Sequence, residues 1–505
     1  MQNKILASAT IFLGLFMAAM ESLIGSTILP SILSSLGGFD LYPWMVSAFL
    51  LSLVITTPLF GKMADHYGFY KTYLIAIGFF MVGSLFCGLS RTMPEMILSR
   101  VIQGVGTGGL INLCMIYVGI AFPTTMRHKI GAVVSSVWAI ASLLGPTLSA
   151  FITAYTSWRF AFLINVPLTI LMLLGTLRWL KDLPQPKNAN PFDYKGATLF
   201  SVAALFVLSM LMGFSKAELR TYELFLATGA VLFSGWLYLH SNQLKNSFIS
   251  LNTLKEHPIV AYSVAIGFCC GVFLFSTSNL LPLFVQGSQG NSVKQVGFVV
   301  ASMAVGTCLG SGLTALLLGR LGFRNCLTFS SLFIILGLGQ MILLNQASTL
   351  GNVLFANFLF GTGIGMSSNG SIVAAQIFSP RSKLGTHTSL FGFFRSVGGM
   401  IAIAVIGALQ LYFFREGVSS DAGELWNSEA SAAFQHPELM LDPTERSKLS
   451  EFVLEKLEVS LAHSIRISFL ALIPAVLFHL WAVRNMPTMR PHEVELVPDP
   501  QSIGE

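Results

Sequence analysis

Long apolar runs recur along the whole chain, and they constrain its fold more than any other feature of the sequence. A run of about 20 apolar residues is what an α-helix needs to cross a bilayer. Only 10% of the 505 residues are charged, whereas a soluble domain is nearer about 25%. The sequence therefore predicts an all-α polytopic membrane protein and excludes a soluble globular one.

The apolar runs predict fourteen membrane-spanning helices. Six come first, a polar linker and two more follow, and six complete the chain. The first run is interpreted as a retained span, because it is too long and too poorly bounded for a cleaved signal peptide. The predicted spans lie at 5–30, 43–61, 71–90, 94–121, 129–152, 160–180, 196–213, 222–242, 259–286, 295–318, 326–345, 350–378, 385–413 and 463–484.

Lysine and arginine are unevenly distributed between the two sides that this span count creates. With the N-terminus in the cytoplasm, the inside segments carry seventeen of these residues and the short outside loops carry five. Cytoplasmic loops of membrane proteins are enriched in Lys and Arg. We therefore predict cytoplasmic N- and C-termini. The net charge of +6 has this topological explanation and does not indicate a nucleic-acid partner.

One long outside segment, residues 415–462, is rich in acidic residues. Near its end, Phe452, Leu454, Leu457 and Leu461 recur at near-helical spacing. This spacing predicts a short amphipathic helix packed over the outer mouth of the protein. A solvated connector is the alternative.

Two parts of the chain repeat each other. QGVGTGGL in the fourth span matches FGTGIGM in the twelfth, and the loop GKMADHYGFYK matches GRLGFRN. Duplicated halves around a cavity are typical of transporters. We predict an N-terminal six-helix half at 1–182, a linker with two inserted helices at 183–258, and a C-terminal six-helix half at 259–505. The aligned glycines are Gly104, Gly106 and Gly108 with Gly361, Gly363 and Gly365.

No sequence signature of an enzyme or of a bound cofactor is present. There is no GxxxxGK[ST] loop to hold nucleotide phosphates, and no soluble stretch is long enough for an ATPase domain. The six cysteines fall in or at the ends of apolar runs without metal-ligand spacing to His, so we interpret them as packing residues. We expect no enzymatic activity, no metal and no cofactor, and transport driven by an ion gradient.

Glu21 is the only acidic residue that we place deep inside a span. An ionisable group at membrane depth is functional by default. Burial favours the neutral carboxyl group, and a nearby cation favours the carboxylate. A glutamate whose surroundings alternate between these conditions takes up and releases a proton, and we predict this role for Glu21. A permanently protonated Glu21 that is hydrogen-bonded between helices is the alternative.

Two arginines also lie inside predicted spans. Glu21 and Arg100 both lie roughly 9–14 Å below the outer surface, at about 1.5 Å of rise per residue. The similar depth predicts that Arg100 biases the charge of Glu21; snorkelling or helix-tying by Arg100 is the alternative. The repeat places Asn357 at the position of Arg100, so only one half keeps the charge. Arg395, midway along the thirteenth span, is expected either to contact the cargo or to brace the C-terminal half.

The central cavity is expected to bind a small-molecule substrate and to be lined by aromatic, methionine and amide side chains. Arg395 is the charged candidate. The others are Met17, Met20, Trp44, Trp138, Phe275, Gln376 and Phe391.

The loop GKMADHYGFYK resembles the G-x-L-A-D-R-x-G-R-K signature of the major facilitator superfamily. Gly61, Ala64, Asp65 and Gly68 match, whereas the basic positions carry other residues and Lys71 comes one place late. In that family the loop latches the two halves together on the cytoplasmic side. The resemblance therefore implies gating roles for these glycines, Asp65 and Lys71, with a weaker latch. Asp65 can still face a helix N-terminus.

Two stretches resemble further signatures of the superfamily. LSRVIQGVGTGG resembles R-x-x-Q-G-x-G, with Arg100, Gln103 and Gly104 in place, and ASLLGPTLSA resembles an antiporter signature that centres on Gly145 and Pro146. Proline kinks a helix because it removes a backbone hydrogen bond. We expect this kink to seal the outward pathway; a purely structural kink is the alternative.

Other stretches resemble the fourteen-helix drug:proton antiporters in particular. SWRFAFLINVP is similar to their W-R-x-x-F-x-x-N-x-P stretch, and PFDYKGATL is similar to the D-x-x-G that opens their seventh span. These proteins also carry an acid nine residues before a proline in the first span, where this chain has Glu21 and Pro30. The resemblance covers essentially the whole chain and implies a major facilitator fold with two six-helix halves and two inserted helices.

The function that this resemblance implies is proton-coupled antiport. Its expected cargo is an amphipathic, cationic drug or toxic compound, exported by alternating access across the bacterial plasma (inner) membrane. The expected partners are the substrate, protons and the lipid bilayer. A dedicated exporter of one metabolite, such as a siderophore, is the alternative on the same fold. The sequence leaves open whether a periplasmic adaptor and an outer-membrane duct join the pump.

Overall fold

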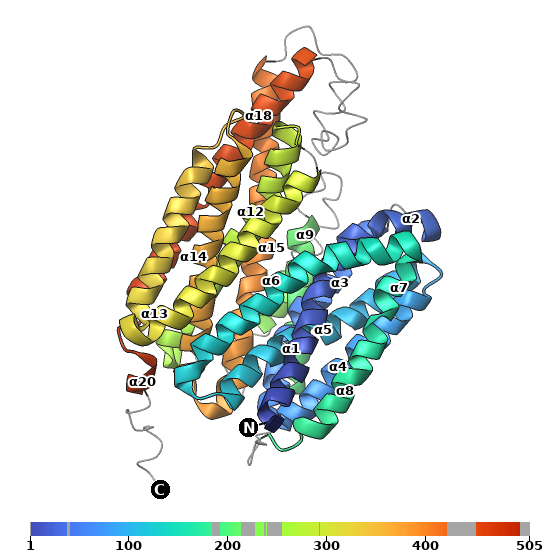
Figure 1. Cartoon of the computed structure of the whole chain (residues 1–505), viewed down its shortest axis with the longest axis vertical. Helices are drawn as coiled ribbons and strands as arrows, with labels where there is room; N and C mark the ends of the chain where they lie inside the picture. The colour runs from blue at the N-terminus through green and yellow to red at the C-terminus, as the bar shows by residue number, and fades with distance from the viewer. Residues whose placement is uncertain are drawn as a thin grey trace.

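The computed structural model is almost entirely α-helical (Figure 1). Among the residues that it describes, eleven helices are long and apolar enough to cross a membrane, and no β-strand occurs. A backbone in lipid must satisfy its own hydrogen bonds, which favours helices over open sheets. The prediction of an all-α polytopic membrane protein is confirmed. The described residues are 2–37, 41–183, 192–213, 228–236, 239, 255–291, 293–421 and 451–494.

The N-terminal helices form one bundle, drawn from blue to green in Figure 1. α1 ends shortly before Pro30, which lies in the first turn of α2, where the missing N–H of proline does no harm. The long apolar helices agree with the first six predicted spans, the sixth being made of α7 and α8. The helices are α1 (Gln2–Thr27), α2 (Leu29–Leu36), α3 (Tyr42–Tyr67), α4 (Phe69–Leu89), α5 (Met93–Ala121), α6 (Thr124–Tyr155), α7 (Trp158–Leu163) and α8 (Asn165–Trp179).

The C-terminal helices form the second bundle, drawn from yellow-green to red in Figure 1. A π-helical turn, Phe284–Ser288, follows its first helix, and a 3-10 turn, Arg381–Lys383, precedes α15. One core of buried apolar residues runs through this bundle. Its helices are α12 (Pro258–Leu283), α13 (Val293–Ile342), α14 (Leu350–Ile377), α15 (Leu384–Asp421), α18 (Glu451–Leu470), α19 (Ile473–Arg484) and α20 (Pro491–Val494).

The two bundles repeat the same tight turn between paired helices. Gly68, between α3 and α4, has φ 86°, and Gly322, within α13, has φ 78°. Glycine adopts positive φ without a steric penalty because it has no Cβ. The backbone of Gly322 is not helical, so α13 consists of two helices that meet at a kink there, and they correspond to the predicted spans 295–318 and 326–345.

The glycines that align in the sequence also make equivalent contacts. Gly106 on α5 packs against the backbone of Phe80, and Gly363 on α14 packs against the backbone of Ile334. A side chain at either glycine would collide with that backbone, so each position permits a close helix crossing. The repeat seen in the sequence therefore has the same geometry in both bundles.

α9 (Tyr194–Gly213) lies where the two bundles meet. Its Phe200 is buried with Leu51 and Val54 of α3, and its ring lies 5.2 Å from that of Phe393 on α15. α9 corresponds to the predicted span 196–213. Most of the second predicted insert, 222–242, lies outside the described residues.

The two bundles are joined at the end of the molecule that carries the N-terminus, and they diverge toward the other end (Figure 1). Asn369 on α14 donates a hydrogen bond to the carbonyl of His128 on α6 at 3.0 Å. The hydroxyls of Ser135 on α6 and Ser311 on α13 lie 2.7 Å apart. α20, the last described helix, lies at this same end (Figure 1).

The end of the predicted outside segment 415–462 differs from expectation. α18 is not a short separate helix, because it runs without interruption from Glu451 into the last membrane span. Leu457 and Leu461 are fully buried in the core of the C-terminal bundle, and the carbonyl of Glu458 accepts a hydrogen bond from Ser288. The apolar spacing thus reflects packing on this bundle. Residues 422–450 lie outside the described part of the chain.

Candidate functional site

Glu21 and Arg100 form an ion pair inside the N-terminal bundle. Nη1 of Arg100 on α5 lies 2.5 Å from Oε1 of Glu21 on α1. The exposed fraction is 1% for Arg100 and 0% for Glu21. Removing one partner of such a buried pair would leave an uncompensated charge, at a cost of about 3–5 kcal/mol. The structure therefore brings together the two residues that the sequence predicted for proton coupling.

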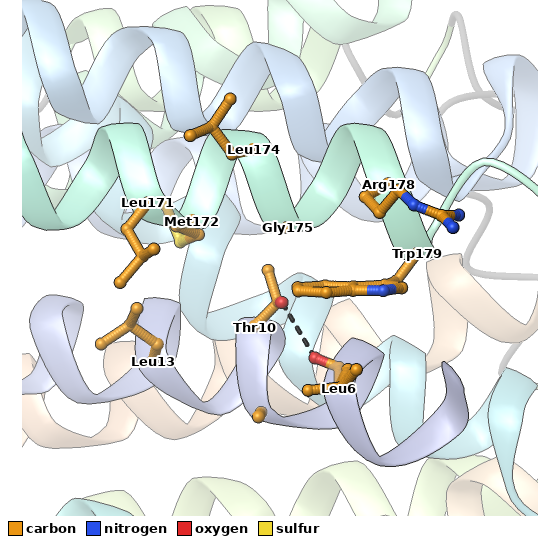
Figure 2. Close-up of a pocket in the computed structure, with 10 residues that line it drawn as sticks. Leu6, Thr10, Leu13, Leu171, Met172, Leu174, Gly175, Arg178 and Trp179 are labelled. Atoms are coloured by element: carbon orange, nitrogen blue, oxygen red, sulfur yellow. Dashed lines mark hydrogen bonds between the residues drawn. The ribbon is translucent and has the colours of Figure 1, made fainter. Parts of the chain in front are cut away.

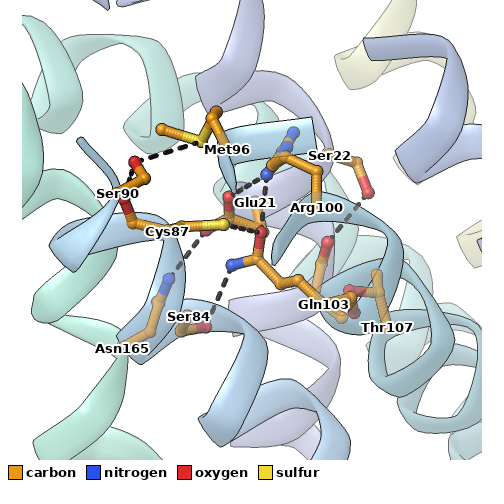
Figure 3. Close-up of polar contacts among 11 residues, drawn as sticks. Glu21, Ser22, Ser84, Cys87, Ser90, Met96, Arg100, Gln103, Thr107 and Asn165 are labelled. Carbon is orange, nitrogen blue, oxygen red and sulfur yellow. Dashed lines mark hydrogen bonds and ion pairs between the residues drawn. The ribbon is translucent and has the colours of Figure 1, made fainter. Parts of the chain in front are cut away.

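Three further polar side chains extend this pair into a network (Figure 3). Nδ2 of Asn165 donates to Oε2 of Glu21 at 2.7 Å. Nη1 of Arg100 also donates to Oε1 of Gln103 at 2.8 Å, and Nε2 of Gln103 donates to the hydroxyl of Ser84 at 2.9 Å. The network thus joins α1, α4, α5 and α8, and it gives Gln103 of the R-x-x-Q-G signature a direct contact with Arg100.

Two aromatic rings cover the guanidinium of Arg100. The ring centroid of Phe49 on α3 lies 4.1 Å from its central carbon, and that of Phe162 on α7 lies 5.5 Å away. Both phenylalanines are buried. Cations are attracted to aromatic faces, and more strongly where water is excluded. Arg100 therefore retains favourable contacts even if Glu21 loses its charge.

The roles of Phe162 and Asn165 were missed by the sequence analysis. Both belong to the stretch SWRFAFLINVP, which was noted only as a resemblance. Asn165 is the first residue of α8, directly after the break at Ile164 that separates α8 from α7. The available signal was a polar amide in an apolar stretch, at the start of a helix.

The network retains unused hydrogen-bonding capacity. Nε of Arg100 and Oδ1 of Asn165 are buried and have no hydrogen-bond partner among the described residues. A buried polar atom without a partner raises the free energy of that state. If Glu21 carried a proton, a rotated Asn165 amide would offer Oδ1 as its acceptor. The site is therefore compatible with two protonation states.

Asp65 joins the two bundles through the start of α15. Its carboxylate accepts hydrogen bonds from the backbone N–H groups of Gly385 and Thr386, each at 2.7 Å, and from the Thr386 hydroxyl at 2.6 Å. α15 begins at Leu384, so a negative charge lies at a helix N-terminus, where the helix dipole favours it. Lys71 is exposed, and no ion pair links it to Asp65 in the described part of the chain.

Glycines allow helices to pack closely both beside Asp65 and beside Glu21. Gly61 packs against Ser389 and the carbonyl of Gly385, next to the Asp65 contacts. Gly145 on α6 packs against Met20 on α1, with 3.2 Å between its Cβ position and the Cγ of Met20. α6 thus contacts α1 one residue away from Glu21. Gly104 packs closely against α3, and the side chain of Pro146 lies outside the described residues.

The residues predicted to line the cavity lie in different surroundings. Met17 and Met20 are fully buried in the N-terminal bundle, and Phe391 is buried against Gly267. Trp44 is 44% exposed. The remaining aromatic candidates, Trp138 and Phe275, are partly buried.

Gln376 lies at the junction of the two bundles. Its Nε2 donates to the carbonyl of Met115 on α5 at 2.9 Å, and its backbone carbonyl accepts from Nη1 of Arg127 on α6 at 3.0 Å. These bonds connect α14 with the N-terminal bundle. Gln376 therefore acts in this structure as an interbundle contact.

Arg395 on α15 differs from Arg100 in its contacts. Its side chain is partly exposed, and among the described residues no hydrogen bond or ion pair involves its guanidinium. The sequence left open whether Arg395 braces the C-terminal half through backbone carbonyls. No such bond is present among the residues that the structure describes.

A groove of about 400 Å³ lies between α1 and α8, outside the Glu21 network (Figure 2). Leu6, Thr10, Leu171 and Trp179 are among the residues that line it. Leu171 is 59% exposed, as expected of a surface that faces lipid. None of the predicted cavity residues lines this groove. Among the described residues, no group of three His, Cys, Asp or Glu side chains is placed to hold a metal ion.

Comparisons with known proteins agree with this architecture. A model of the Major Facilitator Superfamily matches residues 11–403. The chain is 28% identical over 478 residues to "Multidrug resistance protein 3" of Bacillus subtilis (strain 168), with 92% of each chain covered. It is 26% identical over 427 residues to "Multidrug efflux pump SdrM" of Staphylococcus aureus (strain N315), covering 82% of this chain and 91% of that protein.

Two solved structures share the fold. The human organic anion transporter MFSD10 (TETRAN) superposes with a TM-score of 0.60 and 15% identity, covering 93% of this chain and 99% of that one. The proton:xylose symporter XylE superposes with a TM-score of 0.59 and 15% identity, covering 98% and 99%. At this identity the likeness concerns the fold alone.

Proposed function

The chain belongs to the Major Facilitator Superfamily, and we propose that it is a proton-coupled antiporter that exports amphipathic drugs or other toxic compounds across the bacterial plasma membrane. The protein is a multi-pass membrane protein of a transporter family. Two relatives that align over most of their length are named a multidrug resistance protein and a multidrug efflux pump. The observation that carries proton coupling is the buried pair of Glu21 and Arg100.

Glu21 is the proton carrier in this proposal. In the ion-paired state it is a carboxylate held by Arg100 and Asn165. Proton uptake neutralises the carboxylate and breaks the ion pair, whereas a guanidinium cannot lose its own proton. Arg100 then keeps Gln103 and the ring of Phe49, and the protonated Glu21 donates to Asn165 after its amide rotates. Both states thus have partners for every charge.

Coupling to the cargo acts through conformation. Glu21 has an exposed fraction of 0%, so cargo does not contact it in this conformation. Its neighbour Met20 packs against Gly145 of α6. Ser135, on the same helix, contacts Ser311 of the other bundle. A change at Glu21 can therefore alter the packing of the helix that lies between the two bundles.

The conformation itself is outward-facing in this proposal. The bundles are joined at the end that the distribution of Lys and Arg predicts to be cytoplasmic, and there the carboxylate of Asp65 on α3 accepts hydrogen bonds from the start of α15. Export requires this end to open, with loss of the Asp65 contacts. Alternation between the two forms then moves cargo outward and protons inward.

The unpaired Arg395 favours a second candidate for the cargo. A guanidinium inside a membrane span that makes no ion pair attracts a negatively charged group. Cargo with a carboxylate or a similar anionic group would satisfy it. This observation supports zwitterionic or anionic compounds, including the dedicated export of one metabolite such as a siderophore.

Transport in proteoliposomes with an imposed pH gradient tests both parts of the proposal. Cationic, zwitterionic and anionic compounds are compared for the wild type and for Arg395→Gln. If the natural cargo is acidic, Arg395→Gln should reduce export of compounds with a carboxylate and should not affect export of purely cationic ones. Export that does not respond to the gradient for any compound would refute proton coupling.

A further inference from the structure

A second pocket, of about 330 Å³, lies between the two bundles at the end where they are joined. Three elements form it: α6 from the N-terminal bundle, and α13 and α20 from the C-terminal bundle. The lining residues are Thr125, His128, Lys129, Ala315, Leu316, Gly319, Arg320, Pro491 and His492. The pocket is separate from the Glu21 network and from the groove between α1 and α8.

The lining of this pocket is strongly basic. Lys129 and Arg320 supply two fixed positive charges, and both side chains are exposed. His128 and His492 add two imidazoles, whereas none of the described lining residues carries a carboxylate. The acid that follows His492, Glu493, forms an ion pair with Arg490 at 3.8 Å. The pocket is therefore suited to an anion.

His128 provides a buried polar group within the pocket. It is 4% exposed, and its Nδ1 has no hydrogen-bond partner among the described residues. Its backbone carbonyl accepts the bond from Asn369 that joins the two bundles. An anion that reached this ring would thus contact the interbundle junction directly.

The segment that closes the pocket is fixed to the C-terminal bundle. The backbone N–H of Phe323 donates to the carbonyl of Met489 at 3.1 Å, and Nε of Arg324 donates to the carbonyl of Met486 at 2.7 Å. These bonds hold the segment before α20 against the turn at Gly322. The bonds position α20 beside α6, so the pocket is built from both bundles at once.

We propose that this pocket binds the phosphate headgroup of an anionic phospholipid. Leu316, one helical turn before Arg320 on α13, is 70% exposed and offers an apolar surface for an acyl chain. Basic pockets between membrane helices on the cytoplasmic side are suited to such headgroups. A bound headgroup contacts Lys129 of one bundle and Arg320 of the other, so it stabilises the conformation in which this end is closed.

Native mass spectrometry of the full-length protein in detergent tests the proposal. Phosphatidylglycerol, which is anionic, is compared with phosphatidylcholine, which is zwitterionic. The wild type should retain phosphatidylglycerol selectively. Lys129→Gln combined with Arg320→Gln should weaken its binding roughly thirty-fold, because each cation near an anionic lipid contributes a separate favourable interaction.

A charge-matched variant separates this pocket from general attraction. Lys181→Gln combined with Arg484→Gln removes two other exposed charges and should retain phosphatidylglycerol like the wild type. Equal retention by the Lys129/Arg320 variant and the wild type would overturn the proposal, as would equal binding of both lipids. Should the double variant fail to fold, Lys129→Gln alone should weaken binding roughly five-fold.

Inorganic phosphate distinguishes a lipid from a soluble anion. At millimolar concentration it should neither displace phosphatidylglycerol nor raise the melting temperature of the protein. If it does both, the pocket is a soluble phosphate site and the lipid proposal is wrong.

Discussion

Glu21 on α1 and Arg100 on α5 are 79 positions apart in the sequence, yet they form an ion pair at 2.5 Å inside the N-terminal bundle. Both side chains of the pair are buried. Its counterpart in the C-terminal bundle is uncharged, since Asn357 donates to the carbonyl of Val299 instead. The proposed proton cycle therefore depends on the N-terminal bundle.

Glu21→Gln should abolish export driven by a pH gradient and leave the protein folded. Glutamine has a similar size and still accepts a bond from Arg100, but it cannot take up and release a proton. The measurement is transport in proteoliposomes. Glu95→Gln, at an exposed carboxylate at the start of α5, is the matched control and should export normally. Export by Glu21→Gln at the wild-type rate would refute the proton-carrier role.

Arg100→Lys should impair export more than its retained charge suggests. A lysine ammonium lacks the planar fork with which Arg100 contacts Glu21 and Gln103 and stacks on Phe49. Arg100→Ala leaves Glu21 without a cation, which we expect to lower stability by about 3–5 kcal/mol unless Glu21 takes up a proton. Arg484→Lys, at an exposed position, is the control for transport and melting temperature. Normal export by both Arg100 variants would contradict the coupling.

Asn165→Ala should move the pH dependence of export toward higher pH. The carboxylate form of Glu21 loses the donor at 2.7 Å, so the neutral form is favoured and Glu21 binds its proton at higher pH. The readout is the export rate across a pH series. Asn325→Ala, at an exposed amide on α13, should leave the profile unchanged. An unshifted profile for Asn165→Ala would show that this amide does not influence the proton.

Asp65→Asn should open the joined end of the two bundles. The amide offers one acceptor to the three donors of Gly385 and Thr386 and loses the charge at the start of α15. We expect the ratio of closed to open forms to fall roughly 5- to 30-fold, for a loss of about 1–2 kcal/mol. Thiol labelling of Ser135→Cys, introduced beside Ser311, reports the opening. Unchanged labelling in the Asp65→Asn background would argue against a latch.

The sidedness of the chain can be tested with introduced cysteines. Ser34→Cys on α2 should react with an impermeant thiol reagent on intact cells, whereas Lys181→Cys after α8 should react only after permeabilisation. Both positions are exposed. Five of the six native cysteines are buried and Cys308 is partly buried, so the background should be low. Labelling of both positions from outside would refute the cytoplasmic N-terminus.

The sequence by itself determined the features that lie within one segment. The apolar runs determined the helices, because crossing lipid demands length and hydropathy that neighbouring residues already show. The cost of a charge in the membrane singled out Glu21, Arg100 and Arg395 without any knowledge of the fold. The repeated glycines indicated the duplication, and Gly68 and Gly322 do adopt equivalent turns.

Only the tertiary structure decided which side chains meet. Hydropathy indicates how deep in the membrane a residue lies, but not the direction in which its side chain points from the helix. The contact between Asn165 and Glu21, which are 144 positions apart, could therefore not be predicted. For the same reason the sequence could not show that Gln376 joins α14 to α5. A polar side chain within a span takes its role from the atoms that satisfy its hydrogen bonds. Helix rotation and packing determine those atoms, and they are properties of the assembled bundle.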